Sequence, residues 1–161
     1  MNTRNLAIAI TVLIVASTLA AYFFLTPKGT SIEMTTDKQT FTAGEYIEIT
    51  LKITNHDRET KIYDMSPPAF EMLIYHENGT LWTKYTEGQA FPEIYIRKEL
   101  KQGESYQEEY IWNLYKYDES TFDFIRPQHG IYLLEGVLRS EPETKTEKIQ
   151  LEIEPRPKIK P

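Results

Sequence analysis

YIEITLKIT (residues 46–54) is the stretch of this 161-residue sequence that decides its fold. From its second residue on, isoleucine or leucine alternates with glutamate, threonine or lysine. A period of two places successive side chains on opposite faces of a strand, so one face is buried and the other is in water. The stretch therefore predicts a half-buried strand of an antiparallel sheet.

Further short strands are predicted around this stretch. Asn78-Gly79 is the strongest short signal for a hairpin, and Ser66-Pro67-Pro68 breaks the chain between two strands. The other predicted strands are 32–36, 61–64, 70–75, 81–85, 94–97, 106–112, 131–138 and 148–153. Short strands with turn residues between them predict an all-β fold, an antiparallel immunoglobulin-like β-sandwich of seven to nine strands.

The N-terminal segment is apolar. Residues 6–25, LAIAITVLIVASTLAAYFFL, carry no charge and as a helix would span roughly 30 Å, the thickness of a bilayer core. Arg4 precedes the run and Lys28 follows it, which favours a cytoplasmic N-terminus. We expect one transmembrane helix in residues 1–25, with the rest of the chain extracytoplasmic at the cell membrane. A signal peptide cleaved after Ala20 is the alternative; a buried core helix is disfavoured because no polar stripe interrupts the run.

One soluble domain is expected after this anchor. Residues 26–30 form a short linker, residues 31–154 form the sandwich, and residues 155–161 form a tail rich in proline and lysine. The linker reaches at most about 18 Å, so the domain is expected close to the membrane. The formal net charge of −6 disfavours binding to nucleic acid.

The middle of the chain resembles a known family. FEMLIYHENGTLWTKYTEGQAF (residues 70–91), LKQGESYQEEYIWN (residues 100–113) and HGIYLLEGVL (residues 129–138) are similar, in this order, to the BsuPI-type intracellular proteinase inhibitor domain. The resemblance implies a β-sandwich and a protease as the protein partner. The matching positions, expected to be structural, are Trp82, Gln89, Ala90, Phe91, Gly103, Glu104, Trp112, Gly130 and Tyr132.

Two departures from the family pattern accompany this resemblance. Gln102 stands where the family prefers proline before the glycine. The family's name describes a soluble cytoplasmic inhibitor, whereas this chain is expected to carry an export anchor. The second departure argues against a cytoplasmic protease as the target.

Residues 113–128 form the most informative connection. They lie between two predicted strands, exceed an ordinary hairpin loop in length, and carry Tyr115, Tyr117, Phe122 and Phe124. Long loops on rigid sandwiches often carry binding, and aromatic residues often anchor partners. We expect these four rings to supply part of a partner-binding surface. The alternative is a lid that covers one end of the core.

No pattern for catalysis or metal binding is found. His56, His76 and His129 lack the spacing of a zinc site, no cysteine is present, and there is no G-x-S-x-G motif. Glu108 and Glu109 are consecutive, so on a strand their carboxylates point to opposite faces. We therefore expect no catalytic residue, no metal, no cofactor and no enzymatic activity.

Two local motifs have a functional and a structural interpretation. Asn78-Gly79-Thr80 is an N-glycosylation sequon and also a hairpin turn, and both can hold because a hairpin tip is exposed. Trp82 and Trp112 are interpreted as core residues, with ligand stacking as the alternative.

Three functional hypotheses follow. The favoured one is a membrane-anchored, extracytoplasmic protein-binding module, with proteinase inhibition implied by the resemblance. The second is a structural or assembly module of a cell-envelope complex without inhibitory activity. The third, an enzyme, is the least favoured.

Overall fold

Strand β3 (Ile47–Asn55) lies at the centre of a three-stranded sheet in the computed structural model, which describes residues 28–140 and 143–155. β1 (Thr30–Thr36) and β8 (Ser105–Trp112) flank it, both antiparallel. The alternation predicted for this stretch is confirmed, since its apolar side chains are fully buried. These side chains are Ile47, Ile49, Leu51 and Ile53.

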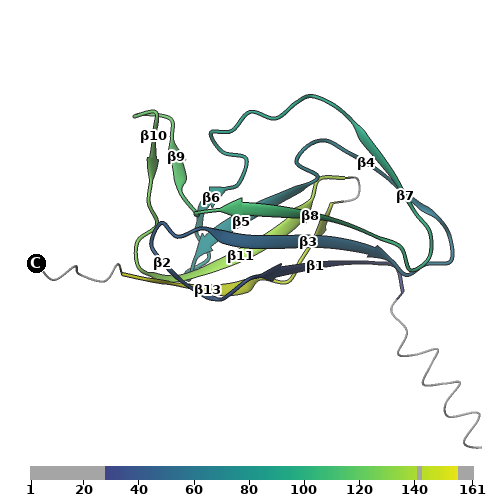
Figure 1. Ribbon diagram of the computed structural model, residues 1–161, viewed down its shortest axis with the longest axis horizontal. Helices are drawn as coiled ribbons and strands as arrows, with labels where there is room; N and C mark the ends of the chain where they lie inside the picture. The colour runs from purple at the N-terminus through teal and green to yellow at the C-terminus, as the bar shows by residue number, and fades with distance from the viewer. Residues whose placement is uncertain (1–27, 141–142, 156–161) are drawn as a thin grey trace, which may run out of the picture.

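A second sheet stacks on the first (Figure 1). Its strands, in spatial order, are β2 (Thr40–Thr42), β13 (Ile149–Glu154), β11 (Gly130–Leu138), β5 (Phe70–His76) and β6 (Leu81–Lys84), and β12 (Thr144–Lys145) also pairs with β11. The chain therefore changes sheets between β1 and β2. Two sheets face to face, with no helix in the described residues, make this an all-β sandwich.

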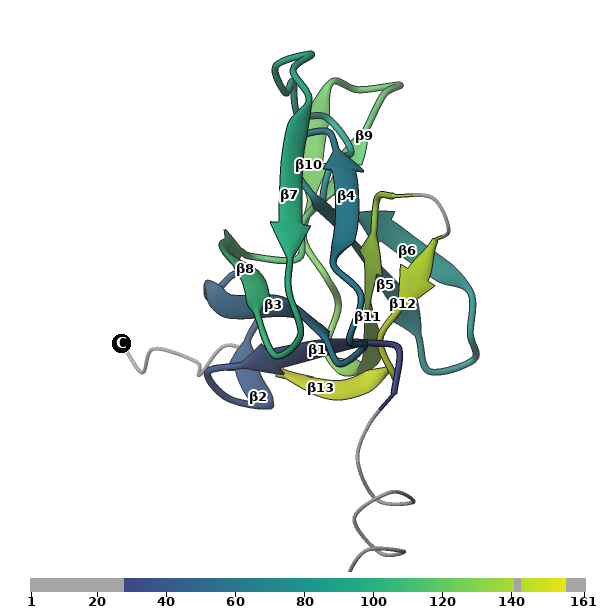
Figure 2. The same ribbon diagram turned by 90° about the vertical axis from the view of Figure 1, so that its right-hand side faces the viewer.

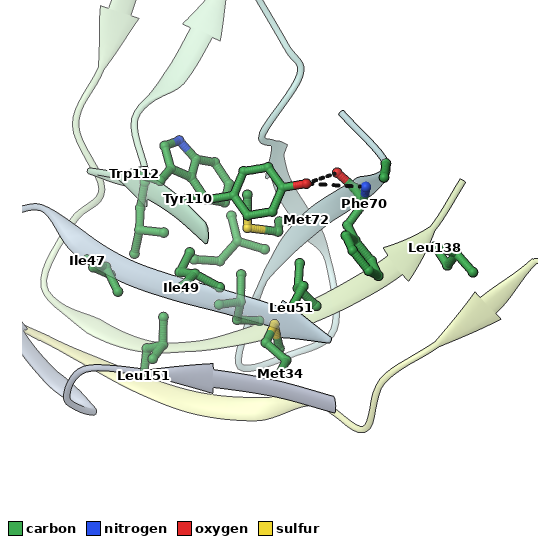
Figure 3. Packing of buried hydrophobic residues seen from close by; sticks show 14 of the residues in the cluster. Met34, Ile47, Ile49, Leu51, Phe70, Met72, Tyr110, Trp112, Leu138 and Leu151 are labelled. Carbon is green, nitrogen blue, oxygen red and sulfur yellow. Dashed lines mark hydrogen bonds between the residues drawn. The ribbon is translucent and has the colours of Figure 1, made fainter. Parts of the chain in front are cut away.

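The core lies between the two sheets. Figure 3 shows Tyr110 and Trp112 of β8 pointing towards Met72 and Phe70 of β5. The backbone amide of Phe70 donates to the hydroxyl of Tyr110 over 3.3 Å, so the polar tip of this buried ring has a partner. Trp112 is only 5% exposed and lies in the core, where the sequence predicted it.

Glu108 joins the two sheets at the rim of the core. Its carboxylate accepts hydrogen bonds from the hydroxyl of Tyr106 (2.5 Å), from the hydroxyl of Tyr110, and from the backbone amide of Ala69 (3.2 Å). Burial, followed by these hydrogen bonds, raises the pKa of both tyrosine hydroxyls. Both hydroxyls therefore stay protonated donors at neutral pH.

Two short ribbons stand on the same side of the sandwich (Figures 1 and 2). One pairs β4 (Lys61–Met65) with β7 (Ile96–Leu100), and the other pairs β9 (Lys116–Asp118) with β10 (Asp123–Ile125). The connection between β6 and β7, residues 85–95, runs between the ribbons. These projections shape the surface described below.

The described residues contain thirteen strands, whereas seven to nine were predicted. The additional strands β2, β9, β10 and β12 have two or three residues each, which is too short for an alternating pattern. The pairing of β2 with β13 is parallel rather than antiparallel. β7 begins at Ile96, not at Ile94, because the amide of Ile94 donates to the carbonyl of Pro92 in a tight turn.

The start of β1 and the β9–β10 ribbon lie at opposite ends of the long axis (Figure 1). In agreement, Thr30 pairs with Asn55 at one end of β3, and Trp112 pairs with Ile47 at the other. Among residues 28–140 and 143–155, no helix is long and apolar enough to cross a membrane. The anchor predicted in residues 1–25, its cleavage-site alternative, and residues 156–161 of the tail lie outside the described residues.

Candidate functional site

The connection expected to be a binding loop is an ordered hairpin. Within residues 113–128, β9 and β10 pair so that Tyr117 stands opposite Phe124, with ring centres 5.3 Å apart. The flanking pairs of the ladder are Asp123 with Asp118 and Ile125 with Lys116. Strand pairing fixes the backbone, so the aromatic side chains leave it in defined directions.

Tyr117 seats the hairpin on the β6–β7 connection. A Cβ placed on Gly88 would lie 2.4 Å from Cγ of Tyr117 and 2.7 Å from its Cβ. Gly88 also has a φ of 73°, a left-handed conformation that glycine adopts without steric cost. The half-buried ring of Tyr117 therefore packs against the backbone of Gly88.

The base of the hairpin is tied to β6. The indole Nε1 of Trp82 donates to the carbonyl of Leu114 over 3.2 Å. Tyr115, also half-buried, lies beside the guanidinium of Arg126, 5.7 Å from the ring centre, and its amide donates to Oδ1 of Asn113. Tyr115 thus contacts other residues of the same connection, and Tyr117 contacts the β6–β7 connection.

At the tip of the hairpin, Phe122 projects into solvent with 80% of its surface exposed. The carboxylate of Asp118 accepts hydrogen bonds from the amide (2.9 Å) and the hydroxyl (2.7 Å) of Ser120, which order the turn and lower the pKa of Asp118. Phe124 and Ile125 of β10 are exposed as well. Phe122 is therefore exposed on a structured turn, and Phe124 on the strand that follows it.

A second exposed apolar segment lies in the β6–β7 connection. Tyr95 is 87% exposed and its neighbour Ile94 is exposed too. Because residues 94–97 were predicted as a strand, this exposed segment was not expected from the sequence. Pro92, just upstream, was the signal for a loop, since proline cannot donate a ladder hydrogen bond.

The family model for the intracellular proteinase inhibitor BsuPI matches residues 34–143, more than half of the chain, including both exposed segments. This chain belongs to the BsuPI family. The resemblance identified in the sequence is thereby confirmed.

Three BsuPI motif positions hold backbone turns or the core. Trp112 packs in a T-shaped arrangement on Tyr85, with ring centres 5.7 Å apart. The hydroxyl of Tyr132 donates to the carbonyl of Gln128 over 3.1 Å, the hydrogen bond of a tyrosine corner close to where Gly130 opens β11. Gly103 has a φ of 80° in the turn between β7 and β8.

The BsuPI positions Gln89 and Phe91 shape the β6–β7 connection. The side-chain amide of Gln89 donates to the carbonyl of Tyr85 over 2.5 Å. The ring of Phe91 lies 6.2 Å from that of Tyr85. Both residues therefore hold the segment that leads to Ile94 and Tyr95.

The remaining candidate residues lie apart from these segments. Asn78 is exposed in the β5–β6 turn, and its Oδ1 accepts from the amide of Thr80 over 2.9 Å. His56 bonds the hydroxyl of Ser31, and the ring of His76 lies against that of Trp82. In the part of the chain that the structure describes, no group of three or more histidines and acids could hold a metal ion.

No curated protein matches the chain, but solved structures with similar folds exist. A β-glucosidase from Listeria innocua in complex with glucose has 12% identity and a TM-score of 0.42, with 77% of this chain and 16% of that chain covered. The sporulation control protein Spo0M from Bacillus subtilis has 10% identity and a TM-score of 0.48, with 80% and 50% covered. The CARDB domain of PF1109 from Pyrococcus furiosus, in complex with di-metal ions, has 12% identity and a TM-score of 0.41, with 77% and 91% covered. This chain thus spans only 16% of the β-glucosidase, and at such TM-scores these likenesses carry no functional conclusion.

Proposed function

We propose that this chain is a membrane-anchored, extracytoplasmic protein-binding module that inhibits a protease and is not an enzyme. The observation that carries the proposal is the exposed Phe122 on an ordered hairpin. Membership of a proteinase inhibitor family supports inhibition. The uncharged run of residues 6–25 supports the anchor.

We further infer that the sandwich is immunoglobulin-like and that residues 31–154 form one domain. The change of sheets between β1 and β2, the parallel pairing of β2 with β13, and the hydrogen bond of Tyr132 support this inference. Such a sandwich is a rigid support for loops at its two ends.

The proposed anchor and the proposed binding hairpin would lie at opposite ends of the domain. β3 spans nine residues between these ends, a length of about 27 Å. The linker of residues 26–30 joins the end at which β1 begins. The partner would therefore bind on the side of the domain away from the membrane. A soluble or surface-exposed protease could reach the hairpin there.

The test compares Phe122→Ala with Trp112→Ala in the full chain, held in detergent micelles. Loss of an anchor ring typically weakens binding by about 2 kcal/mol or more and leaves folding almost unchanged. Loss of a buried ring costs about 3–5 kcal/mol of stability. Partner capture from the source organism's extracellular proteins and urea unfolding are measured on the same samples.

Inhibition is tested on the captured protease at stoichiometric concentration of the chain. The proposal expects wild-type chain to slow the protease and Phe122→Ala to have lost most of this effect. If Phe122→Ala captures and inhibits like wild type, the hairpin is not the binding site. If the captured partner is not a protease, the inhibitor function is wrong.

One observation favours the alternative function, an assembly module of a cell-envelope complex. Among the described strands β8 pairs only with β3, so its other edge is open over eight residues. Ile111 on this strand is 65% exposed. An open edge can accept a strand from a neighbouring protein. Stable co-purification with envelope proteins, sensitive to Ile111→Lys but not to Phe122→Ala, would support this function.

A further inference from the structure

A groove lies between the β4–β7 ribbon and the second sheet. Two hollows of about 590 and 550 Å³ share Ser66, Tyr95 and Arg139, so they are continuous. The larger hollow is bounded by residues of β4 and by residues of β5, β6, β11 and β12, four strands of the second sheet. The smaller continues along the β6–β7 connection, beneath the exposed Ile94.

The walls of the larger hollow combine apolar side chains with charges. Leu73, Leu81 and Val137 supply apolar surface from three strands of the second sheet. The ring of Tyr95 stands at the junction of the two hollows, largely exposed. Such a surface suits a chain segment that has apolar side chains.

The acids of the larger hollow are all engaged within the chain. Asp64 accepts two hydrogen bonds from the guanidinium of Arg97, at 2.8 and 2.9 Å. Glu71 accepts from the amide and the hydroxyl of Thr86. Glu143 forms an ion pair with Lys145 over 2.8 Å. The ion pairs balance the charges of Asp64 and Glu143, whereas Glu71 keeps its charge and uses its acceptor capacity on Thr86.

Two cations of the same hollow are not engaged. The side chains of Arg139 and Lys84 have no ion pair and no hydrogen bond with any residue among 28–140 and 143–155. Arg139 lines both hollows, and Glu93, an exposed acid, lines only the smaller one. The two unpaired cations outweigh the one unpaired carboxylate, Glu71, so the unpaired charge in the larger hollow is net positive, although the chain as a whole is acidic.

We propose that this groove binds an extended segment of the partner protein in which an acidic side chain is flanked by apolar residues. The acid pairs with Arg139, which presents a planar fork of donors, and with Lys84. The apolar neighbours lie on Leu73, Leu81 and the ring of Tyr95. The proposal deepens the proposed function, because it adds a second contact surface beside the hairpin and defines the chemistry that this surface recognises.

The test uses a displayed library of random decapeptides, selected on the full chain in detergent micelles. We expect enriched peptides to carry aspartate or glutamate beside apolar residues. The best peptide, synthesised with a fluorophore, is then titrated by anisotropy. Arg139→Gln should weaken its binding by about tenfold or more, since a charge-assisted hydrogen bond is lost. Arg58→Gln, at an exposed position in the turn before β4, is the matched control and should bind like wild type.

Each other outcome overturns the proposal. The groove is not a peptide site if no peptide is enriched, or if Arg139→Gln and Arg58→Gln reduce binding equally. If enriched peptides lack an acid, the recognition chemistry is wrong. Phe122→Ala separates this proposal from the hairpin, because it should leave peptide binding unchanged whether or not it abolishes capture of the partner.

Discussion

Replacing Gly88 by alanine should unseat the β9–β10 hairpin. The new Cβ would lie 2.7 Å from Cβ of Tyr117, an atom that no side-chain rotation can move, so the backbone of the hairpin or of the β6–β7 connection must shift. A left-handed non-glycine residue costs about 1–2 kcal/mol. Overpacking costs about 1–3 kcal/mol more. We therefore expect Gly88→Ala to lower the free energy of unfolding by about 2–5 kcal/mol.

Gly79→Ala is the matched control. Gly79 has a φ of 83°, close to that of Gly88, but no heavy atom lies within 4 Å of the position its Cβ would take. Gly79→Ala should therefore lower the free energy of unfolding only by the cost of the left-handed backbone, about 1–2 kcal/mol. The difference between the two variants isolates the contact with Tyr117.

Urea unfolding of the full chain in micelles, followed by tryptophan fluorescence, measures both variants. Trp82 is bonded to the hairpin base, so its emission also reports whether the hairpin has moved. In a Tyr117→Gly background, which removes both the ring and its Cβ, Gly88→Ala should cost no more than Gly79→Ala does. If Gly88→Ala and Gly79→Ala have equal effects in the wild-type background, the hairpin is not seated on Gly88 and the reasoning is wrong.

Three further predictions concern pH and topology. Asp118, whose pKa is lowered by its bonds to Ser120, should stabilise the hairpin tip above its unfolded pKa of about 4 and lose this effect as the pH falls through the lower folded value. The amide resonance of Ser120 should shift in that acid range, and Asp118→Asn should abolish the shift. Burial, and then the hydrogen bond to Glu135, raise the pKa of Tyr75 to about 12. The protonated hydroxyl of Tyr75 therefore stabilises the fold fully below its unfolded pKa of about 10, and this stabilisation is lost as the pH rises towards 12. In an absorbance titration, Tyr75→Phe should remove one tyrosine that ionises late; an unchanged late phase would contradict this. Finally, the protein should stay in the membrane fraction after high salt, and protease added to intact cells should reach it; a soluble cytoplasmic pool of full-length chain would refute the anchor proposed in residues 6–25.

The strands with a clear alternating pattern were predictable within a few residues at either end. In β3 and β13 the apolar period of two is a local property, and burial of one face followed it. The Asn78-Gly79 hairpin was predictable for the same reason, since turn chemistry depends on adjacent residues. The BsuPI resemblance also rested on local motifs in a fixed order.

The candidate site was predictable only in part. The aromatic load of residues 113–128 indicated either a binding surface or a lid, and the sequence could not assign each ring. The structure divides them: Tyr115 and Tyr117 pack on the chain, whereas Phe122 and Phe124 are exposed. The covering of Tyr117 depends on Gly88, a residue far away in the sequence.

The sequence by itself determined that this is an all-β chain of half-buried strands and that it resembles an inhibitor family, because periodicity and turns are encoded by neighbouring residues. Only the tertiary structure decided that β2 joins β13 in parallel, that the β9–β10 hairpin and the start of β1 lie at opposite ends, and that Arg139 and Lys84 share one groove. These features arise from contacts between distant segments. Their geometry depends on how the two sheets stack, and no local pattern specifies that.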